Sequence, residues 1–339
     1  MLRILAVIGA AALGWMAATP SETSVTPGTI GTIESEGQNE SFERDQIQAK
    51  VAKAMMENDF KTLNAMEAEF QTRRSLTPSG VWKLGVYYDS MQFAFEPDPD
   101  CISQNEEFLD HWRAAYPTSP GPVIAKAAAL ADKAWCIRGG SFAYKVSRSA
   151  MDSFGNILSE ANDLLDDAKD TVSHDPEFYA VKARVLLGLN TDRDEYMALL
   201  NEGLDREPYY FPIYYEGYSY FMPQWHGSWN ELSAFAHSAV SRTSKRLGSE
   251  AYVRFYWHLT KCNCQTAYDT KNWPKMKDGM AEMYARYPTN WNASAFTMLS
   301  CKEQDWATAK LYAEKVGDAP SGVDLSEFES CRASIAQMG

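Results

Sequence analysis

The stretch 209-YYFPIYYEGYSYFMPQWHGSWNELSAF-235 decides the fold class, because it places eleven aromatic residues in 27 positions. A helix over 212–221 would be aromatic on nearly every face, and such a helix must be buried or must line a groove. The following Pro-Gln-Trp-His-Gly-Ser segment breaks it. Ser228 and Glu231 form a capping box, which predicts a new helix starting at Trp229. We therefore expect the core of an all-α protein here.

The bulk composition favours a large core and argues against two kinds of partner. The chain has 339 residues, of which 45% are apolar, and its formal charge is −13. Binding to nucleic acid without sequence specificity, or to an anionic membrane, needs a basic surface. We expect no nucleic-acid partner and no membrane contact beyond an N-terminal anchor.

The N-terminus is typical of an exported protein. Residues 1–18 carry one cation and then an apolar run that is short for a membrane span and suits a secretory signal. A cut after Ala18 would put Met16 where a small residue is preferred, so an uncleaved anchor is the alternative. Residues 19–40 are rich in Ser, Thr, Gly, Glu and Pro and predict a disordered linker. The helical domain is expected over 41–339, in the periplasm or secreted.

The remaining helices follow from apolar periodicity and from Pro and Gly breakers. The sequence predicts a helical pair over 41–76, an aromatic helix over 81–95, a second pair over 101–140 and one long helix over 146–172. Gly139 would supply the left-handed cap at the end of the second pair.

Six cysteines in an exported chain predict disulfide bridges, with buried free thiols as the alternative. Cys101 and Cys136 are expected near the ends of neighbouring helices, and so are candidates for one bridge. The other four share the C-terminal third and would close two more bridges: Cys262, Cys264, Cys301 and Cys331.

A metal site is the competing interpretation of the middle cysteines. His258 and Cys262 are four residues apart on a predicted helix, and Cys264 follows, a spacing that can begin a soft metal site. The two thiols, however, point to opposite sides of a helix, which suits disulfides to different neighbours. We therefore expect no metal.

The sequence offers little support for catalysis. It contains no nucleophile elbow, no His-Glu-x-x-His, no phosphate-binding loop and no dinucleotide fingerprint. The five histidines are scattered. We expect no catalytic residue and no cofactor. The one acid with an unusual setting is Glu216, which lies among tyrosines, although a solvent-facing or ion-paired role is the simpler interpretation.

One internal recurrence indicates a repeat architecture. An Asp-Pro at 175–176 and a Glu-Pro at 207–208 lie 32 residues apart, and two helical segments lie between them. A period of about 34 residues built from two antiparallel helices is the tetratricopeptide arrangement. Arg184 and Tyr196 fall where that repeat has small residues, so this copy is degenerate.

Two motifs sharpen the resemblance. Residues 133–139 read K-A-W-x-x-R-G and residues 223–228 read P-x-W-x-G-S. At these places the chain resembles tetratricopeptide-like proteins, specifically a group of exported bacterial helical-repeat proteins of unassigned function. That resemblance implies a scaffold fold, an α-solenoid of antiparallel helix pairs, and leaves the activity open.

The paired motifs also suggest a binding site. Arg138 lies one turn after Trp135, and a pocket with Trp225, His226 and Trp229 is our hypothesis. The alternative is structural: Arg138 would neutralise the dipole at the end of its helix.

Two tyrosines are further candidates. Tyr214 and Tyr218 would form a wall for stacking a peptide or a sugar, with core packing as the alternative.

The function expected from the sequence is an exported scaffold or adaptor that binds a protein or peptide partner. The alternative is an all-α carbohydrate-active or other hydrolytic enzyme with an aromatic cleft and two acids. Two buried acids that converge on such a cleft would favour the enzyme.

Overall fold

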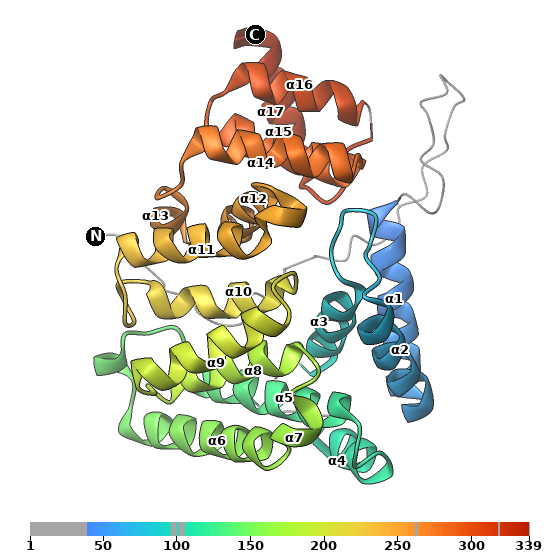
Figure 1. The fold of residues 1–339 in the computed structure, drawn as a ribbon, viewed down its shortest axis with the longest axis vertical. Helices are drawn as coiled ribbons and strands as arrows, with labels where there is room; N and C mark the ends of the chain where they lie inside the picture. Colours follow the sequence, from blue (N-terminus) through green and yellow to red (C-terminus); the bar gives the residue numbers. More distant parts are fainter. Residues whose placement is uncertain (1–38, 96–99, 102–105, 262–263, 318, 339) are drawn as a thin grey trace. The chain divides into compact units, whose positions relative to one another are not determined.

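The computed structural model describes residues 39–95, 100–101, 106–261, 264–317 and 319–338 (Figure 1). These residues form helices and turns, and no β-strand occurs among them. The all-α prediction is therefore confirmed. The predicted signal, the linker up to residue 38, and Cys262 lie outside the described residues.

The described chain divides into two compact units. The first contains Gln46–Leu76 and Val81–Glu282, and the second contains 39–45, Thr77–Gly80 and 283–338. Helix α1 (Glu40–Met56) therefore begins in the second unit, and α14 (Trp273–Arg286) ends in it.

In the first unit, consecutive helices pack against each other: α4 against α5, α5 against α6, α8 against α9, and α11 against α12. The α-helices that lie wholly in this unit are α2 (Phe60–Arg73), α3 (Lys83–Phe95), α4 (Glu106–Ala115), α5 (Pro120–Arg138), α6 (Arg148–Asp167), α7 (Lys169–Val172), α8 (Glu177–Gly188), α9 (Arg193–Arg206), α10 (Phe211–Gly217), α11 (Trp229–Leu247), α12 (Glu250–Leu259) and α13 (Gln265–Tyr268).

Helix α5 is the central helix of this unit, because it contacts α2, α3, α4, α6 and α8. Its alanines keep its surface narrow and let these neighbours approach. A proline begins it, where the missing N–H has no helical partner in any case. Gly139 ends it, as predicted, and donates its N–H to the Trp135 and Cys136 carbonyls. Its φ is +68°, but its ψ of 177° lies outside the left-handed helical region, so the left-handed cap expected here does not form.

The long helix predicted over 146–172 is wrong in one respect. The structure breaks it into α6 and α7 at Ala168, whose φ of −99° and ψ of 2° leave the helical region. Val172, in the short helix α7, is fully buried. Apolar periodicity does not predict the break at Ala168, because the spacing of the buried positions continues across it.

The aromatic stretch forms core. Helix α10 ends at Gly217 and continues as a 3-10 turn over Tyr218–Phe221, so the helix predicted over 212–221 is helical throughout, with a tighter last turn. Phe221 stacks on Phe235 of α11 with ring centroids 4.4 Å apart. Ser228 caps α11 by accepting the N–H of Glu231 at 3.3 Å, which confirms the predicted cap.

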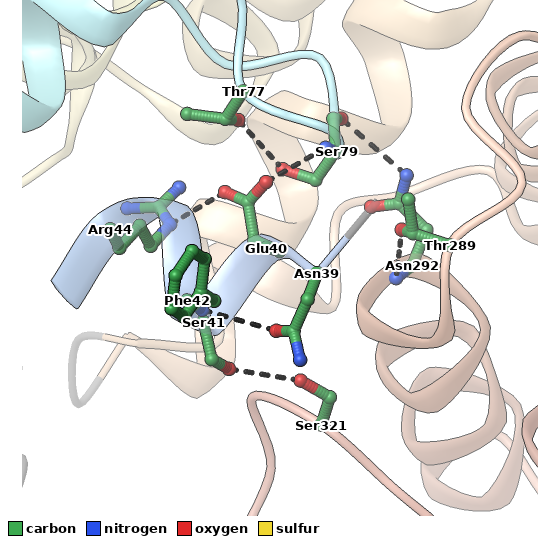
Figure 2. A network of polar contacts seen from close by, with 10 residues as sticks. All are labelled: Asn39, Glu40, Ser41, Phe42, Arg44, Thr77, Ser79, Thr289, Asn292 and Ser321. Carbon is green, nitrogen blue, oxygen red and sulfur yellow. Dashed lines mark hydrogen bonds and ion pairs between the residues drawn. The ribbon is translucent and has the colours of Figure 1, made fainter. Parts of the chain in front are cut away.

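The second unit joins the start of α1 to the C-terminal helices α15 (Asn290–Lys302), α16 (Trp306–Val316) and α17 (Leu325–Met338). Figure 2 shows its polar network. The buried carboxylate of Glu40 accepts from the Arg44 side chain at 2.6 Å and from the Ser79 N–H at 2.8 Å.

Hydrogen bonds extend this network to the C-terminal helices. Ser41 bonds Ser321 at 3.0 Å, and Asn292 donates to the Ser79 carbonyl at 3.4 Å. Hydrogen bonds thus join three segments of the second unit that are distant in sequence.

Candidate functional site

Three of the five residues in the hypothesised pocket, Trp135, Arg138 and Trp225, lie together at the end of α5. The Trp135 and Trp225 rings meet edge to face with centroids 5.6 Å apart. The Arg138 guanidinium lies 5.4 Å from the Trp135 ring, 5.8 Å from Trp225 and 5.9 Å from Phe154. The structure therefore brings the two sequence motifs together as one cluster, which we call the arginine cage: Trp135, Arg138, Phe154 and Trp225.

Arg138 also fastens the loop that follows α5. It donates to the carbonyls of Gly139 at 2.9 Å and Ser141 at 3.2 Å. Partial burial lowers its pKa, although a guanidinium stays charged at physiological pH. It has no ion pair in the described part of the chain, so the three rings are its main partners. Arg138 is the last residue of α5, and its hydrogen bonds reach the two carbonyls beyond the helix end.

The indole N–H groups of Trp135 and Trp225 are buried without a hydrogen-bond partner.

His226 and Trp229 do not join the cage contacts. His226 stacks on Tyr220 with centroids 4.5 Å apart, and burial lowers the pKa of its imidazole. Trp229 is 36% exposed at the start of α11.

Tyr214 and Tyr218 are core residues. The Tyr214 hydroxyl donates to the Pro208 carbonyl at 3.2 Å, and the side chain is fully buried. Tyr218 is also buried and packs edge-on against Phe255 and His258. Neither presents a free ring face for stacking a peptide or a sugar.

The loop after α5 carries exposed aromatic side chains that the sequence reasoning missed. We call residues 139–147 the aromatic loop. Phe142 is 50% exposed and Tyr144 is 80% exposed, and their rings stack with centroids 5.8 Å apart and planes at 10°. A signal was present in the sequence, because the two aromatic residues follow a Gly-Gly breaker, outside the predicted helices. In the structure, Phe142 precedes a single 3-10 turn over Ala143–Lys145, which contains Tyr144.

A second feature is an acid-lined cavity of about 30 Å³ among α3, α5, α8 and α10. Its polar lining includes Asp132, Glu177, Arg184 and Glu216. Arg184 pairs with Asp132 at 2.8 Å, so the large residue that departs from the repeat pattern neutralises a buried acid. The space suits one or two water molecules.

Glu216 and Glu177 both contribute to this lining. Burial raises the pKa of both carboxyl groups, and the charge of Arg184 partly offsets the shift at Glu216. The Tyr210 hydroxyl donates to Glu177 at 2.6 Å. Glu216 makes no direct ion pair among the described residues, and its side chain is half-buried, so it is neither ion-paired nor fully solvent-facing.

Two more acids, Glu67 and Asp175, share a hydrogen bond deeper in the same unit. Glu67 accepts from Ser119 at 3.2 Å, at the start of α5, and Asp175 accepts from the Tyr88 hydroxyl at 2.9 Å. Tyr88 also lines the acid-lined cavity, so the two groups of acids are neighbours.

The cysteines form disulfides where the structure describes them. The predicted Cys101–Cys136 bridge is confirmed, with Cα atoms 5.7 Å apart. Cys301 of α15 pairs with Cys331 of α17. Cys264 is also disulfide-bonded.

His258 has the surroundings of a core residue. Its ring stacks on Tyr215 at 4.0 Å, and burial lowers its pKa to about 3. No group of three metal-ligating side chains occurs within the described residues. Among the residues that the structure describes, no helix is both long enough and apolar enough to cross a membrane.

Comparison of the chain with protein-family models, with curated proteins and with solved structures finds no match.

Proposed function

We propose that the chain is an exported helical-repeat scaffold that binds a protein partner through the aromatic loop. The observation that carries this proposal is the exposure of Phe142 and Tyr144 as a stacked pair. Aromatic side chains supply much of the binding energy in protein interfaces, because they bury a large area at a low cost in conformational entropy. Arg138 supports the pair, since it holds the loop by its hydrogen bond to Ser141.

A degenerate tetratricopeptide-like solenoid is the architecture we propose for this scaffold. Helices α8 and α9 pack together between the two recurring prolines, as a repeat unit requires. The departures from the repeat pattern are accommodated by packing: Arg184 pairs with Asp132, and Tyr196 stacks on Tyr220 at 4.0 Å.

Export to the periplasm or the medium is part of the same proposal. Two disulfides, Cys101–Cys136 and Cys301–Cys331, support it, because such bridges persist in oxidising compartments.

Site-specific photo-crosslinking in cells tests the partner. A benzophenone amino acid replaces Tyr144 in one variant and Met56, a residue of α1 that is 79% exposed, in the control. We expect a protein adduct at position 144 and none at 56. With the identified partner purified, Tyr144→Ser should weaken binding at least about tenfold and Met56→Ser less than about twofold. Equal adducts at both positions, or unchanged affinity of Tyr144→Ser, would contradict the proposal.

The alternative is an all-α carbohydrate-active or other hydrolytic enzyme, and the acids around the cavity are what favours it. The cavity of about 30 Å³ is far smaller than ligand pockets of about 300–1,000 Å³. For this reason we place the scaffold first. A hydrolytic activity of the purified chain that disappears in both Glu216→Gln and Glu177→Gln, with the fold intact, would reverse that order.

A further inference from the structure

The aromatic loop lies in a basic part of an acidic chain. From residue 133 to residue 151 the sequence contains four Lys or Arg and no Asp or Glu, whereas the whole chain has a formal charge of −13. The charge of this segment is therefore opposite to that of the rest of the chain.

The cations nearest the exposed rings are unpaired. Lys126 and Lys133, earlier on α5, are each ion-paired with an acid of α4. Lys145 and Arg148, by contrast, are exposed, and neither has an ion pair in the described part of the chain. Asp152, one turn after Arg148 on α6, makes no ion pair with it in the structure described. Their charges are available to a partner.

The aromatic and cationic groups form one surface. The Lys145 ammonium lies 5.7 Å from the centroid of the Tyr144 ring, which is itself stacked on Phe142. A partner that covers the rings must therefore approach the charge of Lys145, and Arg148 follows three residues later, exposed at the start of α6. Arg138 does not contribute its charge in the same way, because its hydrogen bonds to Gly139 and Ser141 are within the loop.

We infer that the segment which docks on this loop is an acidic stretch of protein. Its Asp or Glu carboxylates pair with Lys145 and Arg148, while an apolar side chain packs on Phe142 and Tyr144. This inference rests on the proposed function and adds the chemistry of the partner. Complementary charge speeds association and excludes basic competitors.

An anionic lipid surface fits the same cations less well. A membrane extends far beyond one loop and would face the acidic remainder of the chain, which repels it. A short peptide contacts the loop alone.

A displayed library of random peptides, selected on the purified oxidised chain, tests the inference before any natural partner is identified. We expect selected peptides to be enriched in Asp and Glu around an aromatic or aliphatic residue. Their affinity should fall at least about tenfold in Lys145→Glu/Arg148→Glu and about tenfold between 50 and 500 mM NaCl. The matched control is Lys50→Glu/Lys53→Glu, the same charge change on exposed residues of α1, and it should change affinity less than about twofold.

Each outcome of this selection distinguishes the two proposals. Peptides that need Phe142 and Tyr144, but are neutral or basic and tolerate Lys145→Glu/Arg148→Glu, overturn the charge inference and leave the scaffold proposal standing. Selected peptides that bind Phe142→Ser/Tyr144→Ser as well as the parent overturn both. In a separate experiment, the purified chain is sedimented with vesicles of 30% phosphatidylglycerol. If the chain binds these vesicles and the same loop variants abolish that binding, the loop binds a lipid surface and the inference is overturned.

Discussion

The carboxyl groups of Glu67 on α2 and Asp175 before α8 share a hydrogen bond in the interior of the first unit. Burial raises the pKa of Glu67 to about 8, and the nearby Asp175 charge adds to the shift. Burial raises the pKa of Asp175 to about 7. Ionising both of these buried carboxyl groups costs free energy, so the stability of this unit depends on pH.

The pH dependence has a definite sign. The ordinary pKa values of these groups are 4.5 and 3.8, so between about pH 4 and pH 8 the folded state binds more protons than the unfolded state. The free energy of unfolding should therefore fall as the pH rises through this window, by an amount on the order of a few kcal/mol. Urea unfolding at pH 5 and pH 8 measures it.

Glu67→Gln should flatten this dependence. The amide keeps an acceptor for Ser119 and gains a donor toward Asp175, but it cannot ionise. Glu69→Gln, on the exposed face of the same helix, is the control and should leave the slope unchanged. An equal slope in the parent and in Glu67→Gln would refute the shared-proton interpretation.

Asp132→Ala should be strongly destabilising, because it leaves the buried Arg184 guanidinium without its partner. The two side chains are only 6% and 10% exposed. Breaking such a pair costs about 3–5 kcal/mol, whereas replacing both partners with apolar residues costs less. Asp110→Ala, which removes the partner of Lys126, is the surface control and should cost under about 1 kcal/mol. Denaturant unfolding midpoints of the two variants measure the difference. An equal loss of stability in both would contradict the role of Asp132 as the partner of a buried charge.

Two helical glycines should respond to alanine in opposite directions. A Cβ at Gly203 of α9 would lie 2.6 Å from the Tyr179 ring, so Gly203→Ala should destabilise the protein by about 1–3 kcal/mol. A Cβ at Gly155 of α6 meets nothing within 4 Å, so Gly155→Ala should stabilise it by about 0.5–1 kcal/mol. Thermal unfolding of both variants checks the pair. An unchanged or higher unfolding temperature in Gly203→Ala would show that the α8–α9 contact is looser than the structure has it, and a lower one in Gly155→Ala would show that this site is not open.

The Cys301–Cys331 bridge should stabilise the second unit. Its partners are 30 residues apart in sequence, and a bridge of this span contributes about 2–4 kcal/mol. Cys301→Ala/Cys331→Ala should therefore speed hydrogen exchange in α15 and α17 and leave α5 unchanged. Alkylation of the folded exported protein before and after reduction, read by mass, gives the complementary test. Free alkylation of Cys301 and Cys331 without reductant would refute the bridge.

The sequence alone predicted the features that depend on neighbours along the chain. Apolar spacing indicated the helices, and the Ser228 cap and the Gly139 stop were predicted correctly because a helix end is set by a few adjacent residues. The Cys101–Cys136 pair was predicted from the ends of two adjacent helices. The Trp135 and Trp225 contact was also anticipated, but from paired motifs and not from geometry.

Only the tertiary structure decided which side chains are hidden and which are free. Tyr214 and Tyr144 are both tyrosines in aromatic segments, yet one is fully buried and the other is 80% exposed. The carboxyl pair of Glu67 and Asp175 arises because helices distant in sequence meet. Burial and charge pairing depend on contacts with segments that are distant in sequence. The periodicity of one segment does not reveal which segments will contact it.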